Sequence, residues 1–588
     1  MRSTTSPPSA AGESSPTPPT PWSAASTPWC CRAPCTSRRR SRTSTGSRRS
    51  PPTRPALHSM PRDTRPCRCA PALTPTAFPP TRRSSAAGST RPPSIKSRAP
   101  MNAPRAGAPS APNCERERRS MSNTELFHLS AGEAGRLLQA RKLSPVELVE
   151  AFLQRIDAVD ARVKSYLLVM ADAARDAARK AEGDIMAGRW KGPLHGIPYA
   201  VKDNYYTRGV RTCAGSRVLM DFVPGYNATA IDRLADAGAI LLGKLNTWEY
   251  GTGNGGVYFD LPFEPACNPW DLDRFTGGSS TGAGASVAAG TAMVAMGSDT
   301  TGSVRLPAAS CGLQGMKPTY GLISRHGILP NCFSMDTPGP MTWTVEDNAI
   351  MLRAVAGHDP ADPASARRPV PDYLANLEAG VRGLTIGILR EFGPEGQHLD
   401  DANRAQLEDM AAVLAREGAR IVEVELPARI ADYRRVTTVI GHSESATIHE
   451  TDLLARGAEM GFALRDKLMS GAMIRSLDYL AAQRRRRELA CATDAMVCSV
   501  DALIAPCAFH VAPPFADNDV LRTLTSQNCC PPFNVSGHPA MTVCTGFDGD
   551  GLPTNAQVVA RWFDEATVYR VARAYERATA WRDRRPVL

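Results

Sequence analysis

The chain has 588 residues and a formal net charge of +11, with 69 Lys and Arg against 58 Asp and Glu. Residues 1–120 hold 21 basic and 4 acidic side chains, whereas residues 121–588 hold 48 and 54, so the positive excess lies wholly in the first segment. No apolar run reaches the roughly 18–20 residues of a membrane helix, which excludes a membrane-spanning protein. The scattered cysteines lack paired spacing, so neither a zinc site nor a disulfide framework is indicated, and a reducing cytoplasm is the expected location.

Residues 1–120 are predicted to be a disordered tail. They contain 23 of the 49 prolines and no valine or tyrosine, so they cannot bury enough apolar surface to offset the entropy of ordering. A gene start assigned too early explains this composition best; a genuine basic tail and a targeting peptide are the alternatives, and a targeting peptide should have an amphipathic face. Nucleic-acid binding would depend on this tail and is not expected, because its arginines lack interleaved aromatic residues.

The first secure element of the remaining chain is a helix that starts after Ser144. Ser144 suits the N-cap, Pro145 suits the first helical position, and Glu147 is placed to close a capping box. An apolar stripe runs from Leu148 to Ile156. The sequence therefore predicts an amphipathic helix here.

Short apolar runs and helical patterns then alternate along the chain. We expect strands at residues 166–170, 197–201, 239–242, 384–389, 421–424 and 501–505, and helices at 171–187, 228–237 and 401–417. Such alternation predicts an α/β fold, a single large layered α/β/α domain around a mixed β-sheet that spans residues 121–588.

Residues 251–302 depart from this alternation, since glycine, serine and threonine dominate them. Two loops stand out, at residues 277–284 and 297–305. Glycine-rich backbone costs stability, which indicates that these loops serve a function.

Two familiar motifs match this sequence only in part. Residues 238–244 have the spacing of a phosphate-binding loop, but Leu245 replaces the hydroxyl residue that would hold magnesium, and the run between the glycines resembles a strand. Residues 278–282 match the G-x-S-x-G nucleophile elbow with Ser280 at its centre. The late histidines that an elbow needs, His510 and His538, sit beside prolines and are better explained as structural residues. We favour neither motif.

Lys202 is the first candidate for chemistry. It ends the apolar strand predicted at residues 197–201 and is followed by Asp203. Burial disfavours the ammonium form and lowers a lysine pKa, which is what a lysine general base requires.

The order of motifs after Lys202 resembles the amidase signature family. The likeness extends from about Ser130 to Leu588 and rests on residues 196–203, 277–280, 299–308 and 311–319, with Cys267-Asn268-Pro269-Trp270 before the first loop and Gly551-Leu552-Pro553 near the end. It implies a Ser303 nucleophile, a bridging Ser279 on a cis peptide bond, and Lys202 as the base. It implies no cofactor and no metal.

The resemblance also assigns supporting and binding residues. It places the oxyanion hole at the N–H groups of Thr300, Thr301 and Gly302, together with that of Ser303. Further assignments are Ser280, Asp299 and Arg305 as supports of the loops, and Tyr250, Gly251 and Thr252 as the lining of the acyl pocket. Thr281 and Thr301 stand where the family often has glycine. A β-branched residue at position 301 disfavours positive φ, which restricts the backbone conformations that the hole can adopt.

The function expected from this resemblance is hydrolysis of a linear carboxylic amide to acid and ammonia or amine, by way of a Ser303 acyl-enzyme. The expected partner is a small-molecule amide, and the expected assembly is a monomer or homodimer without membrane attachment. One alternative is the glutaminase component of a tRNA-dependent amidotransferase, which would require a second protein chain. Another is a non-catalytic scaffold that uses the basic tail.

Overall fold

The computed structural model describes residues 122–252, 260–390, 399–517, 521 and 528–588. The prediction of a disordered tail over residues 1–120 lies outside the described residues. Within them, no helix is long and apolar enough to cross a bilayer. Every predicted strand and helix is present, with ends that differ by at most three residues from those expected.

An eleven-stranded mixed sheet forms the centre of the domain, in the order β1-β3-β2-β6-β8-β7-β12-β13-β11-β9-β10. Neighbouring strands are parallel in β3-β2-β6 and in β11-β9-β10, and antiparallel elsewhere. The strands are β1 (Tyr166–Val169), β2 (Pro198–Lys202), β3 (Ile240–Leu245), β6 (Val294–Asp299), β7 (Gln314–Lys317), β8 (Thr337–Thr342), β9 (Thr385–Ile388), β10 (Arg420–Glu423), β11 (Ala502–Ala505), β12 (Ala540–Phe547) and β13 (Pro553–Val559). A separate hairpin pairs β4 (Cys267–Asn268) with β5 (Asp271–Phe275).

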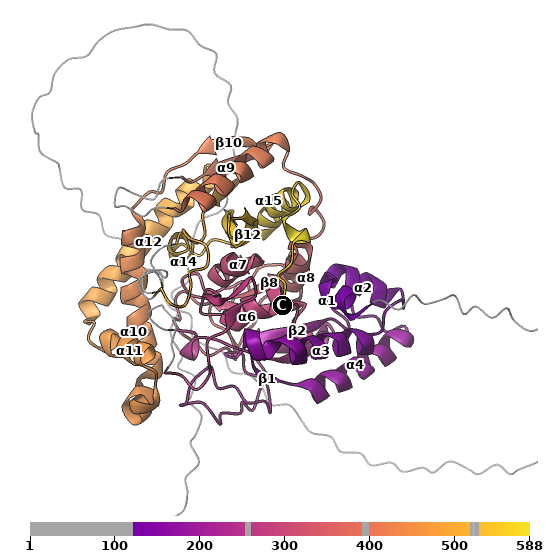
Figure 1. Ribbon diagram of the computed structural model, residues 1–588. Coiled ribbons are helices and arrows are strands. Elements are labelled where there is room, and N and C mark those ends of the chain that lie inside the picture. The colour runs from indigo at the N-terminus through magenta and orange to yellow at the C-terminus, as the bar shows by residue number, and fades with distance from the viewer. Residues whose placement is uncertain (1–121, 253–259, 391–398, 518–520, 522–527) are drawn as a thin grey trace, which may run out of the picture. The chain divides into compact units, whose positions relative to one another are not determined.

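Helices surround this sheet (Figure 1). They are α1 (Asn123–His128), α2 (Ala131–Gln139), α3 (Pro145–Val163), α4 (Ala171–Met186), α5 (Thr229–Asp236), α6 (Thr281–Ala289), α7 (Arg305–Cys311), α8 (Val345–Val355), α9 (Asp401–Arg416), α10 (Ile430–Arg456), α11 (Phe462–Ala472), α12 (Ser476–Cys498), α14 (Pro531–Val535) and α15 (Glu565–Arg577). Ser144 caps α3 as predicted, by accepting from the N–H groups of Val146 and Glu147. The predicted capping box is wrong, because the exposed Glu147 side chain does not accept the return hydrogen bond from the N–H of Ser144.

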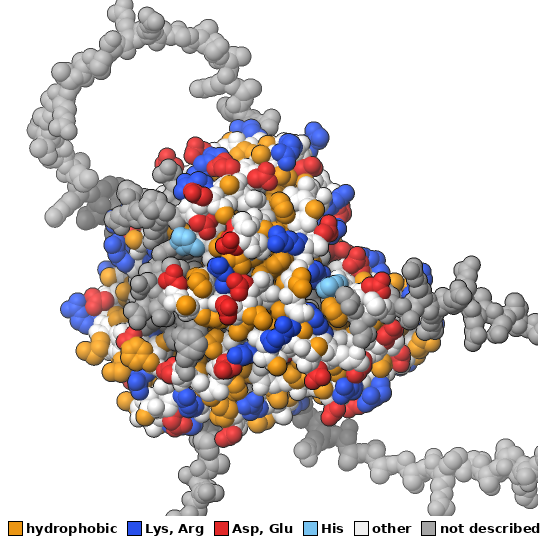
Figure 2. Space-filling view, in the orientation of Figure 1, with side chains coloured by type: hydrophobic (Ala, Val, Ile, Leu, Met, Phe, Trp, Pro, Cys, Tyr) orange, Lys and Arg blue, Asp and Glu red, His pale blue; other side chains and the backbone are white. Residues whose placement is uncertain are grey.

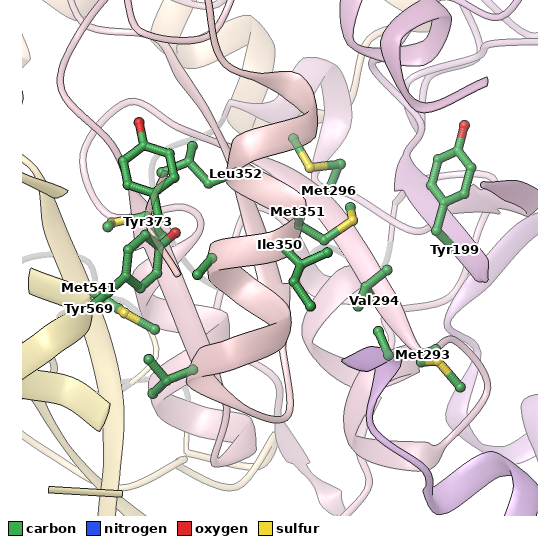
Figure 3. Packing of buried hydrophobic residues seen from close by; sticks show 14 of the residues in the cluster. Tyr199, Met293, Val294, Met296, Ile350, Met351, Leu352, Tyr373, Met541 and Tyr569 are labelled. Carbon is green, nitrogen blue, oxygen red and sulfur yellow. The ribbon is translucent and has the colours of Figure 1, made fainter. Parts of the chain in front are cut away.

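Alternation along the strands separates two apolar layers. Tyr199 and Val294 belong to the cluster beneath α3, α8 and α15, whereas the next residues, Ala200 and Ala295, pack against α6 and α7. Figure 3 shows Ile350 of α8 in the first layer, between Val294 on one side and Tyr569 on the other. The sheet is therefore covered on both faces, as the layered fold requires.

Part of the glycine- and serine-rich region forms α6, a helix whose residues are all buried. All nine of its residues, Thr281–Ala289, are buried, and none is larger than valine. A Cβ at Gly282 would lie 2.3 Å from the main-chain oxygen of Ser165. Close packing of backbone against backbone explains why this segment is built from small residues.

Candidate active site

Lys202 ends β2 and points to the face of the sheet that α6 covers. It shares that face with Ala200, since side chains two apart lie on one side of a strand. Its side chain is fully buried, and Nζ lies 2.7 Å from Ser279 Oγ and 3.1 Å from Ser298 Oγ. Burial lowers the pKa of Lys202 to about 7, although the charges of Asp336 and Asp299 act in the opposite direction. A large fraction of this lysine is therefore neutral near pH 7.

Ser279 lies between Lys202 and the turn that contains Gly251. The Gly278–Ser279 peptide bond is cis, as the family resemblance implied. Ser279 Oγ donates to the carbonyl oxygen of Gly251 at 2.8 Å. Gly251 has φ +68°, and a Cβ there would lie 3.1 Å from Lys202 Nζ. Glycine is thus needed at 251 both for its backbone conformation and for the space beside the lysine.

Asp299 and Arg305 hold the second loop. Both are fully buried, and Arg305 Nε bonds Asp299 Oδ2 at 3.0 Å. Asn534 Nδ2 donates to Asp299 Oδ1 at 2.8 Å, and the N–H of Gly302 donates to the same oxygen at 2.8 Å. Burial opposes the charge of Asp299, but Arg305, the Asn534 donor and the charge of Lys317 hold its pKa at about 2. The loop is closed around one buried carboxylate.

Ser303 lies half-buried just before α7, and its carbonyl oxygen accepts from the N–H of Ser280 at 3.3 Å. Thr301 avoids positive φ, which falls on Gly302 at +125°. Because the Gly302 N–H is bound to Asp299, this structure does not offer it to a ligand. Within the described chain, the N–H groups of Thr300, Thr301 and Ser303 have no acceptor, so these three are the free donors of this loop.

The remaining residues that were predicted for the site, Tyr250, Thr252 and Ser280, each bond a different part of the fold. Tyr250 is fully buried, and its hydroxyl donates to Asp452 at 2.9 Å. Ser280 Oγ is within 3.3 Å of both the N–H and the carbonyl oxygen of Ser298, which ties the first loop to β6. Thr252 Oγ1 accepts a hydrogen bond from Lys467.

Lys467, Asn331 and Asp336 were not predicted from the sequence. Lys467 Nζ donates to Asn331 Oδ1 at 2.7 Å, and Asn331 Nδ2 donates to Thr300 Oγ1 at 3.2 Å. Thr300 Oγ1 in turn donates to Asp336 Oδ1 at 2.6 Å. Burial lowers the pKa of Lys467 to about 8. A signal was present, because Lys467 interrupts the apolar stripe of α11 between Leu464 and Leu468, both of which are buried.

The two disfavoured motifs have structural explanations. Residues 240–245 of the loop-like spacing form β3, and Lys244 Nζ pairs with Asp203 Oδ1 at 3.0 Å in the interior. His538 is buried, with Nδ1 2.8 Å from Ser536 Oγ and Nε2 3.2 Å from Asp494 Oδ1. Among the described residues, neither side chain is hydrogen-bonded to Ser280.

The fold and this site together define an α/β enzyme of the amide-hydrolysing class. The family model for Amidase matches residues 147–569. The chain belongs to this family, the amidase signature enzymes.

Relatives with known names fall into more than one group. The A subunit of the glutamyl-tRNA(Gln) amidotransferase of Chloroflexus aggregans is 41% identical over 492 residues, which cover 79% of this chain and 99% of that protein. The peptide amidase of Stenotrophomonas maltophilia has a TM-score of 0.69 at 32% identity, over 78% of this chain and 98% of its own. The corresponding glutamyl-tRNA(Gln) amidotransferase protein of Thermotoga maritima has a TM-score of 0.61 at 31% identity, over 79% and 96%.

Proposed function

We propose that this chain hydrolyses a carboxamide through an acyl-enzyme on Ser303, with Ser279 as proton relay and Lys202 as general base. The observation that carries the proposal is the environment of Lys202. Its buried Nζ is hydrogen-bonded to two neutral hydroxyls, at 2.7 and 3.1 Å, and its pKa is about 7. A base with a pKa near the working pH is the most effective for proton transfer.

The reaction follows from these positions. Neutral Lys202 accepts the proton of Ser279 while Ser279 accepts that of Ser303, and Ser303 Oγ attacks the amide carbon. The N–H groups of Thr301 and Ser303 stabilise the oxyanion. Collapse breaks the C–N bond, and the proton returns through Ser279 to the leaving ammonia or amine. Water then attacks the ester by the same relay, which releases the acid and restores Ser303.

The resting arrangement requires one adjustment. Ser303 Oγ makes no hydrogen bond within the described chain, while Ser279 Oγ bonds Gly251 and Lys202. Catalytic hydrogen bonds often form only when substrate binds. We infer that substrate brings Ser303 Oγ to Ser279.

The test is substitution of the nucleophile. Ser303→Ala should lower amide turnover by about 10³-fold or more, by analogy with the loss of other serine nucleophiles. A fluorophosphonate probe should label wild type at Ser303, as located by peptide mass spectrometry, and should not label the variant. Unchanged turnover in Ser303→Ala would refute the acyl-enzyme.

Within this chemistry, the relatives favour the glutaminase component of an amidotransferase over a stand-alone amidase. The sequence is 41% identical to the Chloroflexus amidotransferase protein over almost the whole length of that protein. Lys467 adds an observation from the site, since the partners of its buried ammonium among the described residues are Thr252 and Asn331, both neutral. Below its pKa of about 8 it is a cation that would complement a carboxylate on the acyl group, such as the α-carboxylate of glutamine.

An ammonia-release assay distinguishes the amidotransferase component from a stand-alone amidase. The purified chain is given glutamine, acetamide, an aryl amide and a peptide amide, with and without the other amidotransferase chains. Preference for glutamine, with stimulation by those chains, supports the amidotransferase component; rapid partner-free turnover of the other amides supports the stand-alone linear amidase. Lys467→Met should raise KM for glutamine while acetamide turnover is little changed.

A further inference from the structure

Large apolar side chains are exposed along one stretch of the chain, from the end of α10 through α11 to the start of α12. Of the twelve large hydrophobic residues exposed within the described chain, six lie between residues 454 and 480. They are Leu454, Phe462, Met469, Met473, Leu477 and Leu480. Figure 2 shows hydrophobic side chains gathered at the edge of the molecule where α10 and α11 lie in Figure 1. Clustering of this kind marks an interaction surface, whereas single exposed residues need no explanation.

The outer face of α12 continues this surface with positive charge. Leu477, Leu480, Arg484 and Arg487 are three or four residues apart, so they share one face of the helix, and all four are exposed. Within the described residues, neither Arg484 nor Arg487 makes an ion pair, whereas Arg485 pairs with Glu488 at 2.8 Å. The face therefore offers an apolar half followed by two cations without partners.

We infer that this face, defined by Met469, Met473, Leu477, Arg484 and Arg487, binds an amphipathic helix of another protein whose apolar stripe is flanked by acidic residues. The apolar stripe would cover the methionines and leucine, and carboxylates would pair with the two arginines. The binding surface lies outside the chemistry at Lys202, so it goes beyond amide hydrolysis.

Charge argues against the other occupants. Residues 1–120 hold 21 basic and 4 acidic side chains, so that segment has the same sign as Arg484 and Arg487. A second copy packed by two-fold symmetry would bring the same arginines toward each other. An anionic bilayer that covered α11 would also cover the exposed carboxylate of Asp466, between Phe462 and Met469. An acidic helix avoids these conflicts when its carboxylates lie over Arg484 and Arg487 and its apolar stripe lies beside Asp466.

The same helix connects this surface to the active site. On α11, Met469 faces outward, while Lys467 faces inward and bonds Thr252 and Asn331. A partner bound to the outer face would thus contact the helix that positions a buried cation beside the acyl pocket. This gives the partner a physical route to alter substrate affinity.

Fluorescence anisotropy on the full chain tests the inference. The probe is a labelled helical peptide of about 18 residues, long enough to be helical alone, with a leucine stripe flanked by glutamates; a lysine-flanked twin is the charge control. We expect micromolar binding of the acidic peptide only. Met473→Ser/Leu477→Ser should weaken it about tenfold or more, as loss of apolar anchors does.

Charge reversal gives the decisive result. Arg484→Glu/Arg487→Glu should lose the acidic peptide and gain the lysine-flanked one, whereas Met186→Ser, which alters an exposed methionine of α4, should change nothing. In the absence of peptide, the wild-type protein, the two double variants and Met186→Ser should all have the same amide turnover. Absent binding, or equal binding of both peptides, overturns the inference. So does a dimer in sedimentation that Met473→Ser/Leu477→Ser dissociates, or binding to phosphatidylglycerol vesicles in place of the peptide.

Discussion

Two buried lysines on adjacent parallel strands have opposite surroundings. Lys202 of β2 and Lys244 of β3 are both inaccessible to solvent. Lys244 Nζ contacts the carboxylate of Asp203 at 3.0 Å and the carbonyl oxygen of Tyr205 at 2.7 Å, whereas the hydrogen-bond partners of Lys202 Nζ among the described residues are hydroxyls. Burial lowers the pKa of both, but Asp203 opposes that effect for Lys244. The nature of the partners, and not burial, distinguishes a structural lysine from a candidate base.

The largest effect on activity is expected from Lys202. Lys202→Ala should lower kcat by about 10³-fold, within the range that general bases contribute, at every pH. Lys202→Ala should also lower the melting temperature because it leaves a cavity, whereas Lys202→Met, which keeps most of the volume, should leave the melting temperature nearly unchanged and be equally inactive. Steady-state kinetics measure kcat, and calorimetry measures the melting temperature. Activity of Lys202→Ala near that of the wild-type protein would refute the role of Lys202 as general base.

The largest effect on stability is expected from Lys244. Lys244→Met leaves the Asp203 carboxylate buried without its cation and should lower the free energy of unfolding by about 3–5 kcal/mol. Urea denaturation measures it. Adding Asp203→Asn should recover part of the loss, and a single variant as stable as wild type would contradict the comparison.

A smaller effect concerns pH. Lys202 acts as a base only when neutral, so kcat/KM should rise with pH and reach half its plateau near pH 7, where burial has placed its pKa. The variant Lys244→Met, if it folds, should keep this midpoint. A profile that is flat between pH 6 and 8 would exclude Lys202 as the group that titrates.

The smallest effect concerns Asp336. Its charge raises the pKa of Lys202, so Asp336→Asn should move the midpoint of the same profile to lower pH, by less than about one unit, as expected of a charge outside direct contact. Asp372→Asn, which alters a carboxylate at the surface beside Arg353, should leave it in place. A shift of the midpoint to higher pH in Asp336→Asn would show that the Asp336 charge does not raise the pKa of Lys202.

Local patterns allowed much of the fold to be predicted. Strand and helix periodicity depends on neighbouring residues, so the elements of the sheet and the placement of Lys202 at a strand end followed from the sequence. The cis bond before Ser279 followed only from the family resemblance. The Lys467 to Asn331 contact joins residues 136 apart, and no local pattern shows which distant segments meet.

Gly302 illustrates a different limit. The family resemblance placed its N–H in the oxyanion hole, facing the substrate. In the structure it binds Asp299, three residues earlier, at 2.8 Å. Which acceptor a main-chain donor chooses depends on the turn that the loop adopts, and that turn depends on the Arg305 and Asn534 contacts from other segments.

The composition of α6 bears on how this protein could acquire new substrates. Every residue of this helix is buried, and a Cβ at Gly282 would already lie 2.3 Å from the backbone of Ser165, so larger side chains here would disturb the fold. Mutational change in substrate preference is therefore better tolerated elsewhere around the site, at Thr252 and at the α11 side chain Lys467. A directed-evolution library that keeps residues 277–290 fixed and randomises those two positions should retain folded, active members at a far higher frequency than one spread evenly over the site.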